Sequence, residues 1–206
     1  QYNYDGYKLS AVRSYNLIDG SLIGEYYGDD IKGFDFSPNH DILALNMSRI
    51  GSVHFWDTGN KKLIGALQTF NTPAFGARFS PDGKWLAVLY GDSTRIRQTI
   101  NGESLRNANA VVAFSPSDGF LAVGNNEGAI TLENLSGTLK TILVNEHEWI
   151  LDLIYSPDGK QIVSSTSKCN IRIWQTNGGG LVKQLESPKA AGWMVESTRV
   201  AVAKLL

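Results

Sequence analysis

Residues 153–160 read Leu-Ile-Tyr-Ser-Pro-Asp-Gly-Lys, and residues 77–84 repeat that pattern as Ala-Arg-Phe-Ser-Pro-Asp-Gly-Lys. Shorter copies stand at residues 34–39, Phe-Asp-Phe-Ser-Pro-Asn, and at residues 112–117, Val-Ala-Phe-Ser-Pro-Ser. The four copies are spaced 35 to 43 residues apart and hold four of the 6 prolines. Because a fixed period of this length is the signature of a repeat architecture, the copies indicate one unit repeated along the chain.

Each part of the repeated motif predicts a local structure. Apolar residues alternate toward the Ser, as in Phe34 and Phe36, which is the pattern of a half-buried strand. Proline ends that strand because it has no N–H for the ladder, and Gly in the turn adopts positive φ without strain. The runs that follow are apolar on both faces, which predicts strands buried between two layers. They are residues 42–45, 85–89, 120–123 and 161–164.

Two further strands complete the unit. The third ends 18 or 19 residues after the motif Ser, at Trp56, Thr99, Glu133 and Trp174. A turn such as Asn101-Gly102 then opens a fourth, more polar strand, since Asn-Gly is a strong hairpin signal. No stretch shows a sustained helical period. The sequence therefore predicts an all-β fold, a β-propeller of four-stranded antiparallel blades.

The predicted domain organisation is a single propeller domain over residues 1–206. The two ends are interpreted as half blades, the first supplying strands three and four and the last supplying strands one and two, so that together they make one more blade. This arithmetic favours a fragment of a larger propeller over a closed five-bladed ring. The predicted bounds are a half blade at 7–27, blades at about 31–67, 74–105, 109–143 and 150–185, and a half blade at 192–206.

Residues 156–160 together with residues 171–176, Ile-Arg-Ile-Trp-Gln-Thr, resemble the blade signature of the WD-repeat propellers. Residues 53–58, Val-His-Phe-Trp-Asp-Thr, resemble it too, and the resemblance covers nearly the whole chain. It implies a propeller on which partner proteins dock. Fold alone does not give function, so this part of the prediction rests on family analogy.

The repeats depart from the family pattern. Trp ends the third strand only at Trp56 and Trp174, and the Gly-His pair before the first strand is reduced to one Glu146-His147. The turn Asp that would bond this His is replaced by Lys168. The buried Asp-His-Ser-Trp network that the resemblance implies is therefore incomplete in every blade, and we expect packing rather than polar networks to hold the blades together.

Composition excludes several classes of protein. Nineteen Lys and Arg against twenty Asp and Glu leave a net charge of −1, so no basic field is present to bind a nucleic acid backbone. The single Cys169 excludes an internal disulfide and a zinc site built on several cysteines. No apolar run approaches the roughly 20 residues of a transmembrane segment. Gln1 in place of Met leaves two compartments open, the cytoplasm or export with processing.

Candidate chemistry is sparse. The sequence has neither a Gly-x-Ser-x-Gly elbow nor a Gly-x-x-x-x-Gly-Lys phosphate loop. The histidines, His40, His54 and His147, are isolated from one another and are expected to have structural roles. Carboxylates such as Asp82 and Asp158 fall in predicted turns, which explains them without an active site. We therefore predict no catalytic residue, no cofactor and no metal ligand.

Candidate binding residues follow from the resemblance, because residues just before the first strand of each WD-repeat blade surround the channel mouth where partners dock. One of the four blades has only Ala108 and Ala110 at positions seven and five before its motif Ser, Ser115. Trp149 and Phe75 are large aromatics for which both a partner contact and packing between blades are open. The predicted partner-binding residues are Trp149, Phe75, Asp30, Lys32, Pro73 and Leu151.

The predicted function is a non-catalytic platform or scaffold for other proteins. No cofactor is predicted, and one option for the partners is that the chain is a subunit of a larger complex. The first alternative is an extracytoplasmic structural subunit of a larger assembly. The second is a propeller enzyme with a site in the central channel. A flat aromatic mouth around Trp149 favours the platform, whereas a carboxylate cluster or a metal at the channel favours the enzyme.

Overall fold

The computed structural model describes residues 9–47, 51–68, 73–90, 93–99, 103–108, 110–117, 119–136, 138–145 and 148–186. Every regular element within these ranges is a β-strand, and the strands form one two-stranded and four four-stranded sheets. No helix of membrane-spanning length and hydropathy occurs in this described part of the chain. The predicted all-β fold of four-stranded antiparallel blades is thus confirmed.

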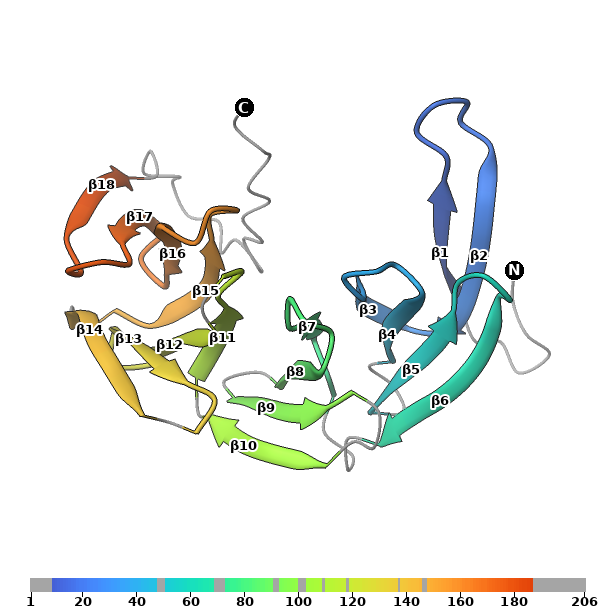
Figure 1. Cartoon of the computed structure of the whole chain (residues 1–206), viewed down its shortest axis with the longest axis horizontal. Helices are drawn as coiled ribbons and strands as arrows, with labels where there is room; N and C mark the ends of the chain where they lie inside the picture. The colour runs from blue at the N-terminus through green and yellow to red at the C-terminus, as the bar shows by residue number, and fades with distance from the viewer. Residues whose placement is uncertain are drawn as a thin grey trace. The chain divides into compact units, whose positions relative to one another are not determined.

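The strands follow one another in chain order across each sheet (Figure 1). The hairpin sheet consists of β1 (Leu9–Tyr15) and β2 (Leu22–Asp29). Sheet 1 consists of β3 (Ile31–Phe36), β4 (Ile42–Met47), β5 (Ser52–Asp57) and β6 (Lys62–Gln68). Sheet 2 consists of β7 (Gly76–Phe79), β8 (Trp85–Tyr90), β9 (Ser93–Gln98) and β10 (Ser104–Ala108). Sheet 3 consists of β11 (Ala110–Phe114), β12 (Phe120–Asn125), β13 (Ala129–Asn134) and β14 (Leu139–Asn145). Sheet 4 consists of β15 (Ile150–Tyr155), β16 (Gln161–Thr166), β17 (Asn170–Gln175) and β18 (Leu181–Glu186).

The described residues fall into two compact units. The first lies within Gln1–Gly91 and Arg95–Leu105 and contains the hairpin sheet, sheet 1 and most of sheet 2. The second lies within Asp92–Thr94 and Arg106–Leu206 and contains sheets 3 and 4. The predicted half blade at 192–206 lies outside the described residues.

The motif Ser closes the first hairpin of every four-stranded sheet. Its amide donates to the carbonyl five residues further on at 2.8 or 2.9 Å, from Ser37, Ser80, Ser115 and Ser156. These bonds begin the ladder between the first and second strands of each sheet at the same place. The motif therefore sets the register of these two strands.

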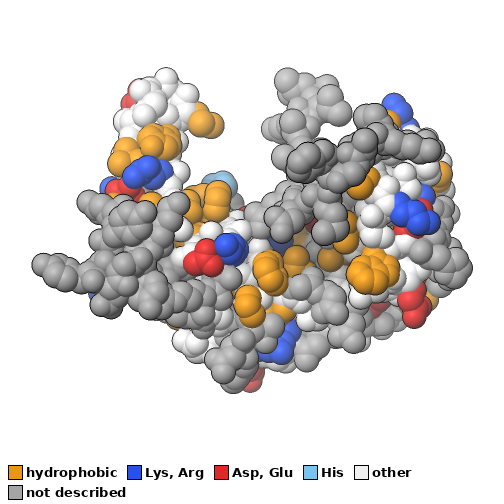
Figure 2. All heavy atoms as spheres, turned by 180° about the vertical axis from the view of Figure 1, so that it is seen from behind, with side chains coloured by type: hydrophobic (Ala, Val, Ile, Leu, Met, Phe, Trp, Pro, Cys, Tyr) orange, Lys and Arg blue, Asp and Glu red, His pale blue; other side chains and the backbone are white. Residues whose placement is uncertain are grey.

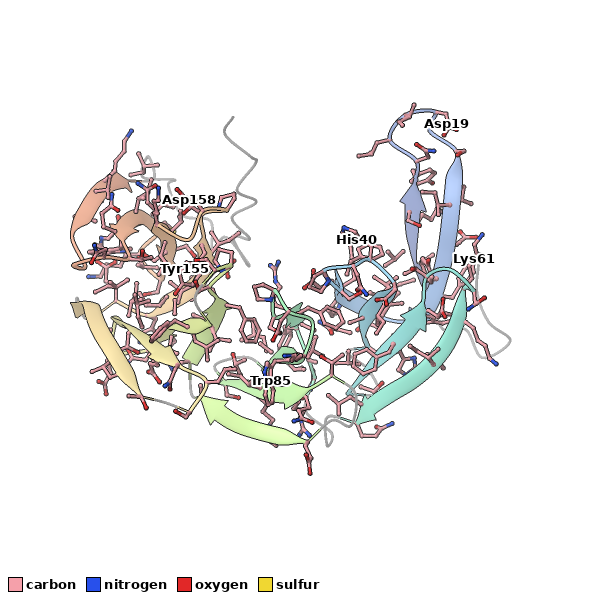
Figure 3. The ribbon with its side chains drawn as sticks, viewed as in Figure 1. Asp19, His40, Lys61, Trp85, Tyr155 and Asp158 are labelled. Atoms are coloured by element: carbon pink, nitrogen blue, oxygen red, sulfur yellow. The ribbon has the colours of Figure 1, made fainter. Side chains whose placement is uncertain are left out.

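The side chains of the Ser-Pro-Asp-Gly-Lys turn add to this closure in sheet 4. The Ser156 hydroxyl donates to Asp158 Oδ1 at 2.6 Å and accepts from the Gln161 amide at 2.9 Å. Gly159 has a φ of 70°, which favours glycine. Figure 3 shows Asp158 at this turn. The carboxylate is thus used in the turn, as the sequence predicted.

Sheets 2 and 1 reproduce this turn with small changes. Ser80 donates to Asp82 at 2.6 Å in sheet 2. In sheet 1 the acceptor for Ser37 is Asp41, at 2.8 Å, and His40 takes the left-handed position with a φ of 62°. The His40 ring makes an edge contact with the Phe36 ring, which fits the structural role predicted for this histidine.

Sheets 1 and 2 stack within the first unit. The Phe79 amide of β7 donates to Asp35 Oδ2 of β3 at 2.8 Å, which joins the two sheets across their faces. Burial raises the pKa of Asp35, although this hydrogen bond and the charge of Arg78 act in the opposite direction. Apolar side chains fill the space between the sheets. They include Ala44, Val53, Ala77, Phe79, Leu86 and Val88.

Phe34 is 53% exposed although it lies on the apolar face of β3. Ala77 and Leu153, which occupy the same position in sheets 2 and 4, are buried. Phe36, on the same face as Phe34, packs against a cluster that includes Tyr26 of the hairpin sheet. Within the described ranges the hairpin sheet has only two strands, so it covers this face in part. The exposure of Phe34 follows from that partial cover.

Sheets 3 and 4 stack within the second unit, where β15 packs against β11 and β12. Ile150 of β15 is buried against Gly124 of β12. A Cβ built on Gly124 would lie 2.6 Å from Ile150 Cγ2 and 3.0 Å from Leu153 Cδ1. Because the branched Cβ of isoleucine restricts its χ1 angle, Ile150 can move away from a new methyl group only at a cost in free energy. Gly124 is therefore required for the close approach of the two sheets.

Gly124→Ala is expected to lower the free energy of unfolding by about 1–3 kcal/mol, since overpacking a filled contact costs that much. The control is Gly65→Ala in β6, where no atom lies within 4 Å of the new Cβ. Urea unfolding followed by circular dichroism compares the two variants. Equal stability of both would contradict the role given to Gly124.

Candidate functional site

Lys32 is held outward by a β-bulge in the first strand of sheet 1. Ile31 pairs with Met47, and Gly33 pairs with the next residue of β4, Asn46, so that Lys32 is the extra residue between them. A bulge interrupts the alternation of a strand and changes the direction of a side chain. The Lys32 side chain is exposed.

Leu151 occupies the same place in sheet 4. Ile150 pairs with Thr166 and Asp152 pairs with Ser165, which leaves Leu151 as the extra residue. Its side chain is exposed, whereas Ile150 beside it is buried. Both bulges lie five residues before the motif Ser, the position selected from the sequence.

Phe75 has a related geometry in sheet 2. Its amide donates to the Leu89 carbonyl at 2.9 Å, and the next residue, Gly76, pairs with the same Leu89. Two residues of one strand therefore lie opposite one residue of its neighbour, as in a bulge. The Phe75 ring is exposed.

The remaining positions selected from the sequence differ in exposure from one sheet to the next. Asp30 has a φ of 50° and its carboxylate lies 2.8 Å from Lys32 Nζ, so these two residues form an exposed ion pair. Pro73 is exposed two residues before Phe75. Of the two positions counted back from Ser115, Ala108 lies in β10 of sheet 2 and Ala110 in β11 of sheet 3, and both are buried. The first unit thus holds Asp30, Lys32, Pro73 and Phe75, and the second holds Trp149 and Leu151.

Trp149 is 58% exposed, the highest value among the described tryptophans. Its backbone is fixed on both sides. The Trp149 carbonyl accepts from the Ser167 amide at 2.9 Å, and the next residue, Ile150, is buried against Gly124. Figure 2 shows one face of the molecule, on which hydrophobic side chains lie among Lys, Arg, Asp and Glu side chains.

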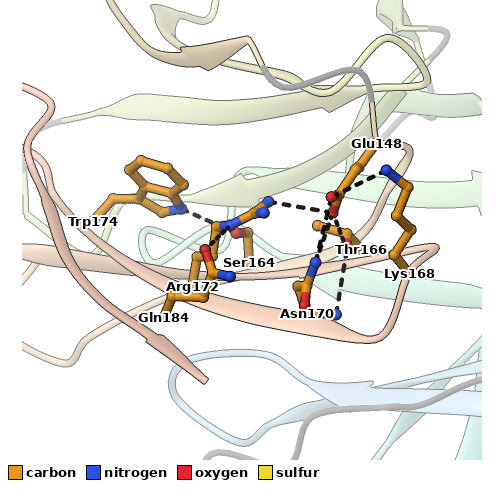
Figure 4. Close-up of polar contacts among 8 residues, drawn as sticks. All are labelled: Glu148, Ser164, Thr166, Lys168, Asn170, Arg172, Trp174 and Gln184. Carbon is orange, nitrogen blue, oxygen red and sulfur yellow. Dashed lines mark hydrogen bonds and ion pairs between the residues drawn. The ribbon is translucent and has the colours of Figure 1, made fainter. Parts of the chain in front are cut away.

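Glu148, directly before Trp149, is buried within a polar network (Figure 4). Its carboxylate accepts from Thr166 Oγ1 at 2.7 Å and from Asn170 Nδ2 at 3.2 Å. Arg172 Nη1 lies 3.3 Å away and Lys168 Nζ 3.5 Å away. The network connects the segment before β15 with β16, β17 and the turn between them.

The environment of Glu148 favours its charged form. Burial of the carboxylate acts to raise its pKa, but the hydrogen bonds from Thr166 and Asn170 and the positive charge of Arg172 outweigh this effect. The pKa of Glu148 is lowered to about 2 as a result. The arrangement is that of a structural anchor, since each polar partner comes from the same sheet.

A second buried polar contact lies in the same sheet. Trp174 Nε1 of β17 donates to Ser164 Oγ of β16 at 3.0 Å. In sheet 1, Leu45 stands where sheet 4 has Ser164, and Trp56 Nε1 has no acceptor among the described residues. Sheet 4 therefore contains buried polar contacts that the sequence did not predict, with the Glu148 carboxylate as their central acceptor.

Sequence reasoning missed Glu148, Thr166, Asn170 and Arg172. One signal was available, because Arg172 stands between Ile171 and Ile173 in a strand and a buried arginine requires an anionic partner. The partner itself was not identifiable, since Glu148 lies 24 residues away.

The remaining titratable candidates show no shared site. Burial lowers the pKa of His54, as expected for a structural histidine, and His147 lies outside the described residues. Cys169 is exposed in the turn after β16. No group of three or more His, Cys, Asp or Glu that could hold a metal is found among the residues that the structure describes.

Comparisons with known proteins agree with the repeat architecture. The family model of the anaphase-promoting complex subunit 4 WD40 domain matches residues 112–200. The WD repeat-containing protein slp1 of Schizosaccharomyces pombe is 26% identical over 208 residues, covering 91% of this chain and 42% of that protein. The nuclear distribution protein nudF of Aspergillus niger is 24% identical over 176 residues, covering 71% of this chain and 40% of that protein. The chain spans about two-fifths of the length of these relatives.

Repeated four-stranded antiparallel sheets that stack face to face define the class of β-propeller proteins. Within that class, the family model, the relatives and the Trp-ended third strands agree on one family. The chain resembles the WD-repeat family in sequence and in its repeated sheets.

The Glu148 network predicts an acid-dependent stability. An unfolded glutamate has a pKa near its ordinary value of 4.5, whereas the folded value is about 2. The folded state thus binds fewer protons between these values, so the contribution of Glu148 is complete above about pH 5 and is lost as pH falls toward about 2. Wild type is expected to lose free energy of unfolding across this window.

Glu148→Gln is expected to show a smaller loss over the same pH range and a lower stability at pH 7, because Arg172 loses its anionic partner at a cost of about 3 kcal/mol. The control is Glu127→Gln, an exposed carboxylate in the turn after β12. Urea unfolding at several pH values measures both. Parallel pH profiles for wild type and Glu148→Gln would show that the network does not contribute.

Proposed function

We propose that this chain is a non-catalytic platform that binds other proteins. The observation that carries the proposal is the outward placement of Lys32, Phe75 and Leu151 at one position in three sheets, with Trp149 exposed beside Leu151. Similarity to the WD-repeat family supports a protein-interaction scaffold in general. Exposed aromatic side chains on a rigid backbone are effective interface anchors.

The acidic side chains of Asp82, Asp158 and Glu148 have structural partners, which supports a non-catalytic platform. Asp82 and Asp158 accept hydrogen bonds within their own turns, and Glu148 is occupied by its buried partners. These acids therefore contribute to folding stability. Of the two residues that the structure describes just before β15, Glu148 is buried and Trp149 presents an exposed aromatic ring, which fits a protein contact better than a reaction.

Trp149→Ala is expected to weaken binding of a partner protein by at least about fivefold, because loss of an aromatic anchor costs more than about 1 kcal/mol. The fold should persist, since the hydrogen bond of the Trp149 carbonyl is made by the backbone. Affinity capture from a lysate of the source organism, quantified by mass spectrometry, compares the proteins retained.

Leu181→Ala is the matched control, because Leu181 is an exposed apolar residue on β18 of the same unit. It should retain the same proteins as wild type. If Trp149→Ala captures the same proteins as wild type, or if circular dichroism shows that this variant is unfolded, the contact role of Trp149 is contradicted.

A further inference from the structure

The turn between β17 and β18 places Asn177 directly before three glycines, residues 178–180. We propose that Asn177 is a site of spontaneous deamidation, at which the backbone nitrogen of Gly178 attacks the side-chain amide. The modification converts a neutral side chain into a carboxylate. It needs no partner protein, so it goes beyond the proposed binding function.

The turn lies at the end of sheet 4 that is remote from Trp149. Thr176 donates its amide to the Lys160 carbonyl at 2.9 Å, which places the turn beside the start of β16. Ile150, the residue after Trp149, pairs with Thr166 at the other end of β16. Deamidation of Asn177 and partner binding at Trp149 are therefore tested separately.

The reaction proceeds through a cyclic imide. The Gly178 nitrogen forms a bond to Asn177 Cγ, the Cγ–Nδ2 bond breaks, and ammonia leaves with the amide proton. Water then opens the five-membered ring at one of its two carbonyl groups. Opening at the side-chain carbonyl gives aspartate, and opening at the main-chain carbonyl gives isoaspartate, in which the chain continues through Cγ.

The glycines leave room for the ring to close. A side chain on the residue after an asparagine hinders the approach of the attacking nitrogen, and glycine has none. A Cβ built on Gly178 or Gly180 would have no atom within 4 Å, so the turn is surrounded by open space. The imide can therefore form without displacing a neighbouring side chain.

Neither reacting group is restrained by a hydrogen bond within the part of the chain that the structure describes. The Asn177 side chain is exposed and has no partner there, and the Gly178 amide donates to no acceptor there. The turn is fixed at its two ends, since the Gln175 amide donates to the Gly180 carbonyl at 2.9 Å. Attack by Gly178 therefore breaks no hydrogen bond of the folded state.

Asn177 differs in this respect from the other asparagines with described side chains. None of them is followed by glycine, and Asn101-Gly102 lies outside the described residues. Asn46 is fully buried. Side-chain hydrogen bonds hold Asn16, Asn39, Asn60, Asn125, Asn134 and Asn170.

Asn126, in the turn after β12, is the closest comparison. Its side chain is exposed and has no hydrogen bond to the described residues. The residue that follows it is Glu127, whose amide donates to Asn125 Oδ1 at 3.0 Å. The nitrogen that would attack Asn126 is thus both hindered by a side chain and held by a hydrogen bond.

The test is incubation of the purified, folded protein near neutral pH for several weeks, with a fresh sample as the reference. Trypsin cleaves after Arg172 and Lys183 and releases residues 173–183, in which Asn177 is the only asparagine. We expect this peptide to gain about 1 Da and to yield both aspartate and isoaspartate forms. An isoaspartate-specific methyltransferase detects the second form, and isoelectric focusing detects the added negative charge.

Conversion at Asn177 is expected to be at least about tenfold faster than at Asn126, which equals a barrier lower by about 1.4 kcal/mol. Glu127→Gly removes the hindering side chain after Asn126 but leaves the amide bond to Asn125 in place. In this folded variant Asn177 should remain about fivefold faster than Asn126, because a hydrogen bond on the attacking amide contributes about 1 kcal/mol. In urea the two sites should react at equal rates.

Asn177→Ser is the control for the position of the modification, and it should abolish the mass gain in residues 173–183. A gain that persists in this variant would assign the reaction to Gln175 and overturn the proposal. Aspartate without isoaspartate would exclude attack by Gly178. Equal conversion of Asn177 and Asn126 in folded wild type or folded Glu127→Gly, or conversion of Asn177 only in urea, would show that the folded turn does not select Asn177.

Discussion

The hydrogen bond from the motif Ser amide to the carbonyl five residues further on is the constraint on which the rest of the molecule depends. It recurs at Ser37, Ser80, Ser115 and Ser156 and closes the first hairpin of each four-stranded sheet. A slip of one residue in that hairpin would turn every side chain of the first strand to the other face. The faces that stack sheet 1 on sheet 2, and sheet 3 on sheet 4, therefore rely on this bond.

The same closure explains why the exposed side chains recur at one position. The ladder begins at the motif Ser in each sheet. A bulge five residues before that Ser therefore lies at the same distance along the first strand in sheets 1 and 4. Lys32 and Leu151 are directed outward there for a backbone reason that is independent of their chemistry. A repeated fold can in this way present different side chains at equivalent places, which suits a platform that recognises partners by surface composition.

Sheet 4 differs from the others in how its end is secured. Packing dominates between sheets 1 and 2, whereas the segment before β15 is tied down by the buried carboxylate of Glu148. The charge of Arg172 requires such a partner, and the bonds of Thr166 and Asn170 reduce the cost of burying the pair. This anchoring holds Trp149 in place while leaving its ring exposed.

The sequence by itself determined the repeat, the strand order within each sheet and the closing turns, because these follow from local spacing, proline and glycine. The resemblance to WD-repeat blades supplied Trp149 and Leu151 as candidates, by counting back from Ser156. Only the tertiary structure decided that Glu148 is buried against Arg172, that Gly124 admits Ile150, and that Phe34 is exposed while its counterparts are covered. These properties depend on residues brought together by stacking and strand pairing, whose separation along the chain leaves no local pattern to read.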